Sequence, residues 1–311
     1  MTTRTVFMGS PAFALPTLRL LAGTGEASTR PFTIVGVVTQ PDRPAGRGRT
    51  LSPPPIKVLA QELGLPVIQP NRLREPAALE QLRLWAPELI VVAAFGQILK
   101  PEALDLPRYG CINVHASILP RWRGAAPIQA AILAGDAETG ITIMRMDPGV
   151  DTGLILSQRY LPIEENDTAG TLSDRLSKLG AELLLDTLPR YLSGDLSPRI
   201  QDNSLATYAP MLKKEQGQLD FTLPATDLAR RVRAFNPWPG AFTLWEGQIL
   251  KIHRAHAVDL PGLCPGAMMV HQGLPAYSTG QGLLVVDEVQ PAGKKSMPGK
   301  VFLQGARGWT G

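Results

Sequence analysis

The sequence of 311 residues has little of several features that define other classes of protein. It contains two cysteines, Cys111 and Cys264, and no C-x-x-C pair, which excludes a disulfide framework and a cysteine zinc site. No apolar run approaches the ~18 residues that a membrane-spanning helix needs. The N-terminus runs into a short apolar segment without a signal-peptide pattern. We therefore expect a cytoplasmic protein with no membrane contact.

Signature motifs of several cofactor classes are missing as well. Gly9–Phe13 follows the first expected strand but lacks the G-x-G-x-x-G fingerprint, so a nicotinamide-dependent oxidoreductase is poorly supported. The segment Gly293–Ser296 is not a P-loop, because Lys295 stands where that motif requires Ser or Thr. The four histidines form no H-E-x-x-H pattern, and no metal is expected.

Composition indicates a globular chain whose charge is unevenly distributed. Apolar residues make up 44% and charged residues 19%, which are ordinary values. Residues 1–205 contain 20 Lys and Arg against 20 Asp and Glu, whereas residues 206–311 contain 11 against 7. The C-terminal part therefore carries the whole net charge of +4, which is compatible with a polyanionic partner.

Short apolar runs alternate with helix-like segments through the first two thirds of the chain. Strands are predicted at Thr5–Met8, Ile34–Val38, Val67–Ile68, Leu89–Ala93, Cys111–Val114 and Ile141–Met144. Helices are predicted at Ala12–Leu21, Ile56–Leu63, Pro76–Trp85 and Pro127–Leu133. Strands this uniformly apolar indicate a mostly parallel sheet that is covered on both faces. The expected fold class is therefore α/β, with a doubly wound, Rossmann-like sheet.

The last third of the chain changes character. A longer helix is predicted at Thr168–Leu192, and residues 193–211 have the composition of an interdomain linker. A helix at Ala225–Ala234 precedes short predicted strands at Ala241–Trp245, Ile249–His253, Gly266–Val270, Ala276–Tyr277 and Leu283–Val289. Several short strands indicate a smaller, β-rich, OB-like barrel. We therefore expect one domain at 1–192, a linker at 193–211 and a basic domain at 212–311.

Two polar residues on one predicted strand are the strongest sign of a functional site. Side chains alternate between the two faces of Gly110–His115, so Asn113 and His115 share one face while Ile112 and Val114 point to the opposite, apolar side. They lie at the end of the strand, where ligands bind in sheets of this class. Either both groups are satisfied internally or they reach a substrate.

A third polar residue, Asp151, lies downstream in the tight loop Asp147–Gly153. A carboxylate near an imidazole fixes its tautomer and favours its protonated form. An imidazolium and an amide donor can stabilise the oxyanion that develops in acyl transfer. A single buried His or Asp more often belongs to a structural network, but the joint pattern of Asn113, His115 and Asp151 favours a catalytic group.

The segments around these residues resemble the signatures of methionyl-tRNA formyltransferases. The resemblance is carried by Gly110–Ile128, Met146–Gly153, Gly9–Phe13, Gln40–Arg49, Arg233–Pro239 and Gln290–Lys295. It spans nearly the whole chain, including the second domain. This extent is informative, because an Asn, a His and a distal Asp alone are shared by several folate-dependent formyltransferases.

The resemblance implies a reaction and its participants. The enzyme would transfer a formyl group from 10-formyltetrahydrofolate to the α-amino group of methionine carried on initiator tRNA, without a metal or an obligate protein partner. The implied catalytic residues are Asn113, His115 and Asp151, and the implied folate-binding segment is Ser117, Ile118, Leu119 and Pro120. Ala116 and Ile118 stand where the family more often has Gly and Leu, and both changes conserve size and polarity.

The expected mechanism is direct attack of the neutral amine on the formyl carbon. Asn113 and a protonated His115 would hold the negative oxygen, while Asp151 would orient His115 and assist proton transfer directly or through a water. Proximity and an oxyanion hole each lower a barrier by several kcal/mol, roughly, so His115 is less expected to act as a covalent nucleophile.

The segment Asp42–Thr50 is a basic loop with glycines that give it conformational freedom. Its arginines, Arg43, Arg47 and Arg49, suit phosphates and base edges. By itself such a loop could be an exposed, solvated one. With the resemblance, it is expected to bind the acceptor end of the tRNA, where single-stranded nucleotides are easier to read than a duplex.

The second domain offers further candidate tRNA contacts. Those expected to bind tRNA are Lys213, Lys214, Lys294 and Lys295, and a wider phosphate-tracking surface would add Arg230, Arg231, Arg233, Lys251, Arg254 and Lys300. For any one of them a solvated surface position is an equally good explanation.

Besides the poorly supported oxidoreductase, two alternative functions and the role of one short segment remain open at this point. A sister formyltransferase acting on a small amine, such as a ribonucleotide or an amino sugar, would not need a basic second domain. A non-catalytic tRNA-binding module would not need all three of Asn113, His115 and Asp151. The run Arg121–Arg123 either caps a helix beside a half-buried Trp122 or places its arginines near the folate tail or the tRNA.

Overall fold

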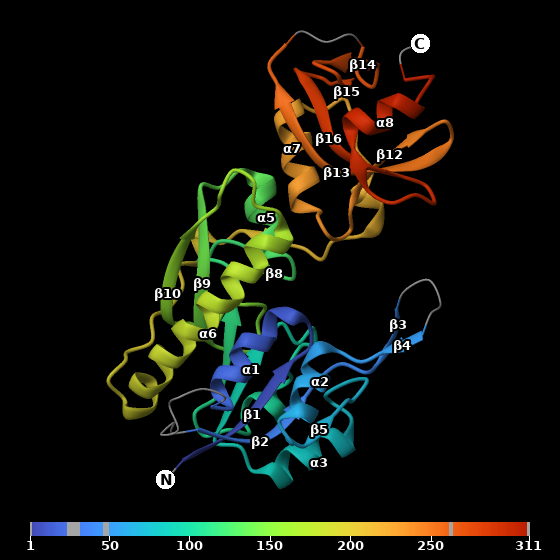
Figure 1. Ribbon diagram of the computed structural model, residues 1–311. Coiled ribbons are helices and arrows are strands. Elements are labelled where there is room, and N and C mark those ends of the chain that lie inside the picture. The colour runs from blue at the N-terminus through green and yellow to red at the C-terminus, as the bar shows by residue number, and fades with distance from the viewer. Residues whose placement is uncertain (1, 24–31, 46–49, 261–263, 310–311) are drawn as a thin grey trace. The chain divides into compact units, whose positions relative to one another are not determined.

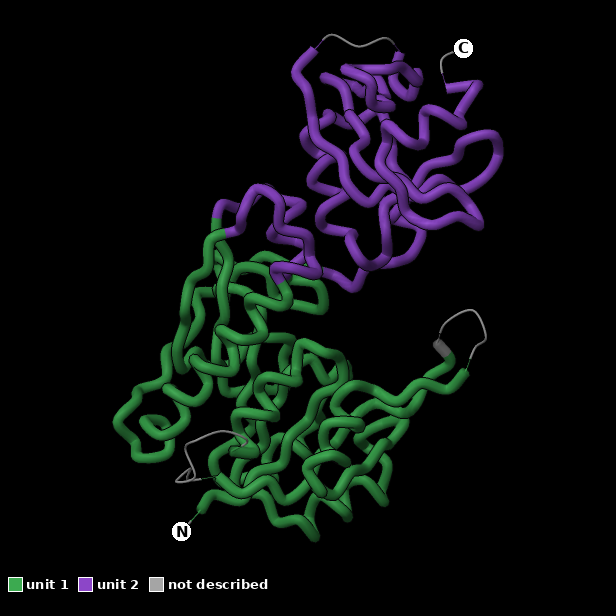
Figure 2. The backbone as a smooth tube through the Cα atoms, viewed as in Figure 1, with its two compact units in different colours: residues 1–127, 138–162, 173–209 green, residues 128–137, 163–172, 210–311 purple. Residues whose placement is uncertain are grey.

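The computed structural model describes residues 2–23, 32–45, 50–260 and 264–309, and this part of the chain divides into two compact units. Unit 1 comprises residues 1–127, 138–162 and 173–209, and unit 2 comprises residues 128–137, 163–172 and 210–311 (Figure 2). The division does not follow a single cut along the chain, because two short segments from within the first two thirds group with unit 2.

Unit 1 is built on a seven-stranded sheet in the order β10-β9-β7-β6-β1-β2-β5 (Figure 1). The parallel strands are β1 (Thr3–Gly9), β2 (Phe32–Val38), β5 (Val67–Ile68), β6 (Leu89–Ala93) and β7 (Cys111–His115). At one side β9 (Glu138–Arg145) runs antiparallel to β7, and β10 (Leu154–Pro162) runs antiparallel to β9. The predicted Rossmann-like, mostly parallel sheet is confirmed.

Helices flank this sheet because its inner strands are apolar on both faces, as in β6, where all five residues are buried. The helices up to residue 205 are η1 (Ala12–Ala14), α1 (Leu15–Leu21), α2 (Pro55–Glu62), α3 (Pro76–Trp85), α4 (Pro101–Leu104), α5 (Pro127–Ala134), α6 (Ala169–Ser193) and η2 (Asn203–Leu205). Two short strand pairs lie outside the main sheet: β3 (Arg43–Ala45) with β4 (Thr50–Ser52), and β8 (Arg123–Gly124) with β11 (Tyr208–Ala209).

The strand order reverses between β1 and β6, since β2 and β5 follow on one side of β1 while β6 and β7 follow on the other. Ligands of open α/β sheets bind at the carboxyl ends of the strands near such a reversal. Gly9 ends β1 there, and an added Cβ would lie 2.8 Å from the carbonyl oxygen of Ala93 at the end of β6. The end of β7 lies beside β6, so Asn113 and His115 reach the same edge of the sheet.

Unit 2 contains a six-stranded antiparallel sheet in the order β12-β13-β16-β15-β14, with β17 paired to β16. Its elements are η3 (Lys214–Gly217), α7 (Ala225–Ala234), β12 (Ala241–Trp245), β13 (Gln248–Val258), β14 (Met268–His271), β15 (Leu274–Ser278), β16 (Leu283–Pro291), β17 (Met297–Pro298) and α8 (Gly299–Gly305). Trp309 packs edge-on against Tyr277 and Phe302 in its core. The predicted strand-rich second part is confirmed.

Among the elements that were not predicted from the sequence, β10 and α8 are the longest. β10 carries Ser157, Gln158 and Arg159 in its middle, and its burial is mixed, as expected for a strand at the edge of a sheet. Neither an apolar run nor a clean alternation marks it. α8 is short and begins and ends with glycine, so it lacks the usual helix signal.

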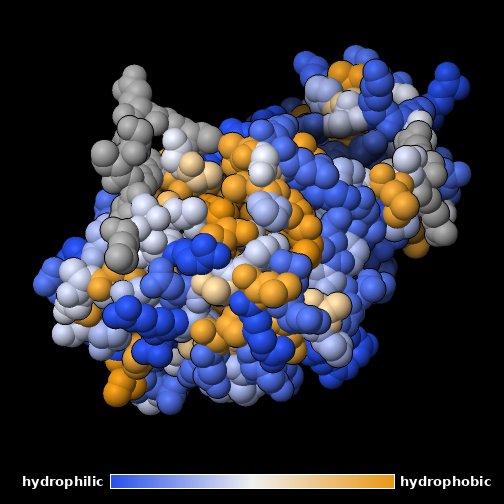
Figure 3. Space-filling view, turned by 90° about the horizontal axis from the view of Figure 1, so that it is seen from below, coloured by the Kyte–Doolittle hydropathy of each residue, from blue (hydrophilic) through white to orange (hydrophobic). Residues whose placement is uncertain are grey.

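The surface of the described chain is mixed in polarity, with apolar patches among hydrophilic side chains on the face seen in Figure 3. None of the helices in the described ranges combines the length and the apolar character needed to cross a membrane.

The helix α6 lies close to the strand that carries the polar pair. A Cβ added at Gly180 would lie 2.7 Å from Cγ1 of Val114 and 3.4 Å from Cδ1 of Ile141. Val114 points away from the face of Asn113 and His115. The helix therefore supports β7 from the face opposite the candidate site.

We predict that Gly180→Val lowers the free energy of unfolding by about 1–3 kcal/mol through overpacking, although valine is intrinsically the better helix former by a few tenths of a kcal/mol, roughly. Lys178→Val, at an exposed position of the same helix, is the matched control. Urea unfolding followed by circular dichroism measures both. A Gly180→Val midpoint no lower than that of the control contradicts the close approach.

Candidate active site

The carboxyl end of β7 presents Asn113 and His115 on one face of the sheet. In register, Asn113 lies opposite Val92 of β6 and Met144 of β9. Asn113 is half-buried, and its side-chain amide has no hydrogen-bond partner among the described residues. His115 is 6% exposed. The amide is therefore free to meet a ligand, whereas the imidazole is held inside the protein.

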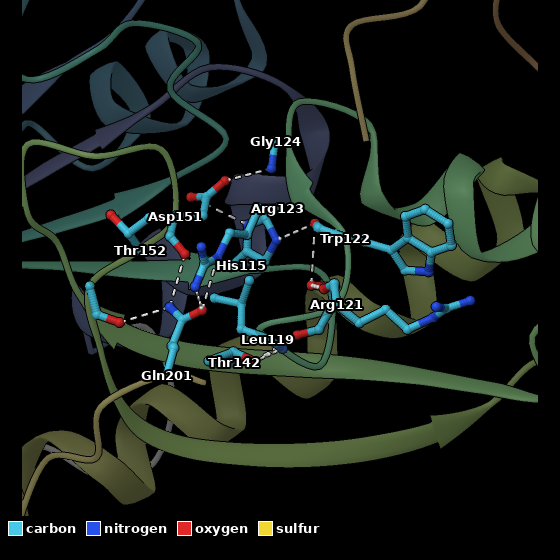
Figure 4. A network of polar contacts seen from close by, with 12 residues as sticks. His115, Leu119, Arg121, Trp122, Arg123, Gly124, Thr142, Asp151, Thr152 and Gln201 are labelled. Atoms are coloured by element: carbon cyan, nitrogen blue, oxygen red, sulfur yellow. Dashed lines mark hydrogen bonds and ion pairs between the residues drawn. The ribbon is translucent and has the colours of Figure 1, made fainter. Parts of the chain in front are cut away.

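The two ring nitrogens of His115 both face acceptor oxygens (Figure 4). Nε2 donates to the carbonyl oxygen of Trp122 at 3.0 Å, and Nδ1 lies 3.6 Å from Oδ1 of Asp151. A carbonyl oxygen can only accept, so Nε2 carries a proton. Nδ1 therefore faces the carboxylate of Asp151. Donation to a substrate oxygen requires one of the two contacts to open.

Asp151 is held in an unusual backbone conformation. Its φ is 52°, in the left-handed region, which costs about 1–3 kcal/mol for a residue other than glycine. Its Oδ2 accepts a hydrogen bond from the backbone N–H of Gly124 at 2.8 Å. Such strain persists only where the surroundings fix the residue, and it is common at functional sites.

The loop around Asp151 is closed by its own side chains. Oδ1 of Asp147 accepts hydrogen bonds from the N–H of Gly149 at 3.1 Å and the hydroxyl of Thr152 at 2.6 Å. At Gly153 a Cβ would lie 1.9 Å from the carbonyl oxygen of Arg145, so no other residue fits there without a shift of the backbone. The loop is therefore fixed at both ends before any ligand arrives.

The predicted folate-binding segment is tied to β9 and β10. Thr142 accepts from the N–H of Leu119 at 3.0 Å and donates to the carbonyl oxygen of Ser117 at 2.7 Å. Gln158 donates to the carbonyl oxygen of Leu119 at 2.8 Å. Ser117 and Leu119 are buried, whereas Ile118 and Pro120 are half-buried. Only the latter pair retains side-chain surface that a ligand could contact.

The run Arg121–Arg123 divides into two different roles. The guanidinium of Arg121 lies over the ring of Trp122, 4.3 Å from its centroid. Arg123 is 2% exposed and donates to the side-chain oxygens of Gln201 and Asn203. Arg123 is therefore part of the interior and does not reach the folate tail or the tRNA.

Several residues around the site were not found from the sequence. They are Gln201 and Thr207, from the segment interpreted as a linker, and Thr142 and Gln158, from two strands. Each acts through contacts with residues far away in the sequence. No local pattern distinguishes any of them from an ordinary polar residue.

Cys111 lies at the start of β7 but takes no part in the site's chemistry. Burial raises the pKa of its thiol to about 12, and the residue is 1% exposed. The thiol therefore stays protonated, which makes it a poor nucleophile.

The predicted basic loop is described only at its base. Arg43 donates to Oε1 of Gln40 at 3.2 Å, and Arg47 and Arg49 lie outside the described residues. The carboxylate of Asp42 accepts from Gln69 and Lys57, and these hydrogen bonds lower its pKa. The base of the loop is thus attached to the sheet edge near β2 and β5.

In unit 2 the four predicted tRNA contacts, Lys213, Lys214, Lys294 and Lys295, are all exposed. Arg233, from the wider basic surface, is half-buried and donates to the carbonyl oxygen of Asp167 at 3.0 Å. Burial lowers the pKa of Arg233. This arginine has a structural contact rather than a free surface position.

Comparison with known proteins supports the predicted family. A family profile described as formyl transferase matches residues 8–188, and one described as formyl transferase, C-terminal domain, matches residues 211–307. A relative from Chloroflexus aggregans, named methionyl-tRNA formyltransferase, is 47% identical over 305 residues, which is 97% of this chain and 97% of the relative.

Solved structures show the same fold. Methionyl-tRNA formyltransferase from Clostridium thermocellum has a TM-score of 0.57 at 16% identity, covering 91% of this chain and 99% of its own. HypX from Aquifex aeolicus in complex with tetrahydrofolic acid has a TM-score of 0.62 at 16% identity over 98% of this chain, which spans 47% of that longer protein. With one profile over more than half of its residues and a relative 47% identical across nearly its whole length, the chain belongs to the formyl transferase family, among members named methionyl-tRNA formyltransferase.

Proposed function

We propose that this enzyme transfers a formyl group from 10-formyltetrahydrofolate to the α-amino group of methionyl initiator tRNA. The observation that carries the proposal is the open amide of Asn113 beside the paired His115 and Asp151, in a chain closely similar to methionyl-tRNA formyltransferases over nearly its full length. Similarity over both parts of the chain favours tRNA as the acceptor, since a small amine would not need a basic second part.

Asn113 and His115 stabilise the charge that develops on the formyl oxygen. The amine's lone pair forms the new C–N bond as the carbonyl electrons move onto oxygen, and the amide N–H of Asn113 is free to donate to it. His115 contributes a second N–H when one of its two present contacts opens. A preorganised donor such as the amide of Asn113 is worth about 3–4 kcal/mol.

Asp151 orients His115 and assists proton transfer. Its Oδ1 faces Nδ1 of His115, while its Oδ2 is occupied by the N–H of Gly124. The attacking amine must lose a proton as the bond to the formyl carbon forms, and Asp151 accepts it directly or through a water. The leaving nitrogen of the donor takes up this proton from Asp151, directly or through a water, as its bond to the formyl carbon breaks. No covalent intermediate on the enzyme is needed.

Folate and tRNA are assigned to different surfaces. The segment Ser117–Pro120 follows β7 directly, and its half-buried Ile118 and Pro120 offer apolar contact to the donor. The exposed lysines of unit 2 and the loop at 42–50 suit the phosphates of tRNA. The segment from residue 212 onward would then serve as the tRNA-binding domain.

We expect the parent enzyme to formylate charged initiator tRNA, and His115→Ala and Asp151→Asn each to reduce kcat/KM by at least ~100-fold, because both remove charge stabilisation or proton transfer. Cys264→Ser, at an exposed position, is the control with unchanged rate. Transfer to a small amine but not to tRNA would favour a sister formyltransferase. Parent-like rates in both variants would falsify the assignment of the catalytic group.

Thr142→Val tests the folate-binding segment without changing side-chain volume. It leaves the buried N–H of Leu119 and carbonyl of Ser117 without their partner, which should lower the free energy of unfolding by about 1–3 kcal/mol. We also expect KM for the folate donor to rise. Thr139→Val on the same strand removes a buried hydroxyl that has no hydrogen-bond partner in the described part of the chain, so it should be neutral or stabilising. A KM for donor that is unchanged in Thr142→Val argues against this segment as the folate site.

The double variant Lys294→Ala/Lys295→Ala should bind tRNA more weakly and with less salt dependence. Removing two phosphate contacts should reduce the slope of log K against log salt concentration by about 1–2. Filter binding of tRNA between low and high salt gives the slope. Lys178→Ala, an exposed lysine of α6, is the control. A slope identical to that of the parent places these lysines outside the tRNA contact.

A further inference from the structure

The segment at residues 199–209, here called the strap, contacts β10, the run that follows the folate-binding segment and the loop that carries Asp151, all in unit 1. Arg199 pairs with Ile155 of β10 through two backbone hydrogen bonds of 2.8 Å. Thr207 accepts from the backbone N–H of Trp122 at 2.9 Å through its hydroxyl. The N–H of Ala125 donates to the carbonyl oxygen of Ala209 at 2.9 Å. The strap is thus fixed at both ends.

Gln201 lies between these anchors and is 5% exposed. Its Nε2 donates to the carbonyl oxygens of Asp151 at 2.9 Å and Gly153 at 2.8 Å. Its Oε1 accepts from Nε and Nη2 of Arg123 at 3.1 and 2.8 Å. Both amide hydrogens and both lone pairs of the side-chain oxygen are therefore used. One side chain joins the loop that carries Asp151 to the run that follows the folate-binding segment.

Arg123 sets the orientation of this amide. A guanidinium can only donate, so it fixes Oε1 of Gln201 on its own side and directs Nε2 toward the loop carbonyls. Nη2 of Arg123 also donates to Oδ1 of Asn203 at 2.8 Å. Within the described residues no carboxylate lies within ion-pair distance of Arg123. The buried guanidinium is therefore satisfied by hydrogen bonds to neutral amide oxygens and not by an ion pair with a carboxylate.

We propose that Gln201, oriented by Arg123, is a positioning residue for Asp151. Resting on the proposed role of Asp151, the inference assigns to Gln201 the task of holding the left-handed backbone that aims the carboxylate at Nδ1 of His115. The N–H of Gly124 fixes one carboxylate oxygen, and Gln201 fixes the main chain of the same residue. Two independent contacts define both the position and the direction of the carboxylate.

Gln201→Glu separates this role from a merely structural one. The substitution keeps the size of the side chain and the oxygen that accepts from Arg123. It also places a negative charge beside the buried guanidinium. It removes both N–H donors and turns a negative oxygen toward the carbonyls of Asp151 and Gly153. A structural role predicts lost stability together with lost activity, whereas a positioning role predicts lost activity with the global fold retained. Ser204→Ala is the matched control within the strap, because the hydroxyl of Ser204 donates to Asp202 and to no other described residue.

The experiment measures formyl transfer to charged initiator tRNA by the parent, Gln201→Glu, Asp151→Asn and the double variant. We expect Gln201→Glu to reduce kcat by about 10–100-fold, as a misplaced catalytic group does, with each KM within about threefold of the parent. In the Asp151→Asn background the same change should have almost no further effect, because Gln201 acts through Asp151. Multiplicative losses in the double variant overturn the inference.

Hydrogen exchange provides a readout that does not depend on activity. Peptides that cover residues 147–153 and Gly124 should exchange faster in Gln201→Glu than in the parent and in Ser204→Ala, while peptides of β6 should not change. Unchanged exchange of the 147–153 loop overturns the inference even if the parent proves inactive on tRNA. An inactive parent with the expected exchange result rejects the proposed function alone.

Discussion

The site depends on the pairing of β7 between a parallel and an antiparallel neighbour. β6 fixes the register of Asn113 through Val92, and β9 fixes the same residue through Met144. Because side chains alternate along a strand, this double register places Asn113 and His115 on one face and leaves Val114 to pack against α6. The positions of both polar residues are therefore set by the neighbouring strands. Thr142, which binds the segment after β7, is carried by β9 and lies opposite His115 in register, so that segment depends on the same pairing.

Polar groups buried at this edge of the sheet are costly unless they are satisfied, and the surrounding residues satisfy nearly all of them. Ser117, Thr142 and Gln158 use their hydrogen-bonding groups on the segment after β7. The side-chain amide of Asn113 is the exception, since no described residue gives it a hydrogen bond. A network that is complete except at one donor behaves as a rigid frame around that donor. Rigidity matters here, because stabilisation of a developing charge works best when the donors need not reorganise.

Much of the fold could be predicted from the sequence, because buried parallel strands appear as uniform apolar runs, as in Leu89–Ala93. That Asn113 and His115 share one face of β7 could also be predicted, because side chains alternate between the two faces along a strand. β10 could not, because Ser157, Gln158 and Arg159 obscure its pattern at the edge of the sheet. Gln201 could not either: it lies 50 residues from Asp151 and 78 from Arg123 along the chain, so its role arises only from tertiary contacts. The polar composition that suggested a linker at 193–211 reflects a segment whose polar groups bind other parts of unit 1.

An amide suits position 201 because this side chain bonds a donor on one side and two acceptors on the other. On one side stands the guanidinium of Arg123, which can only donate, and on the other stand two backbone carbonyls, which can only accept. A carboxylate there would bind the cation but repel the carbonyls, and a lysine would bind the carbonyls but repel the cation. An amide is the side-chain group of this size that accepts at one atom and donates at the other. Arg123 therefore determines the geometry of the loop that carries Asp151 through Gln201, because its N–H groups hold the amide oxygen and leave the two amide hydrogens for the carbonyl oxygens of Asp151 and Gly153.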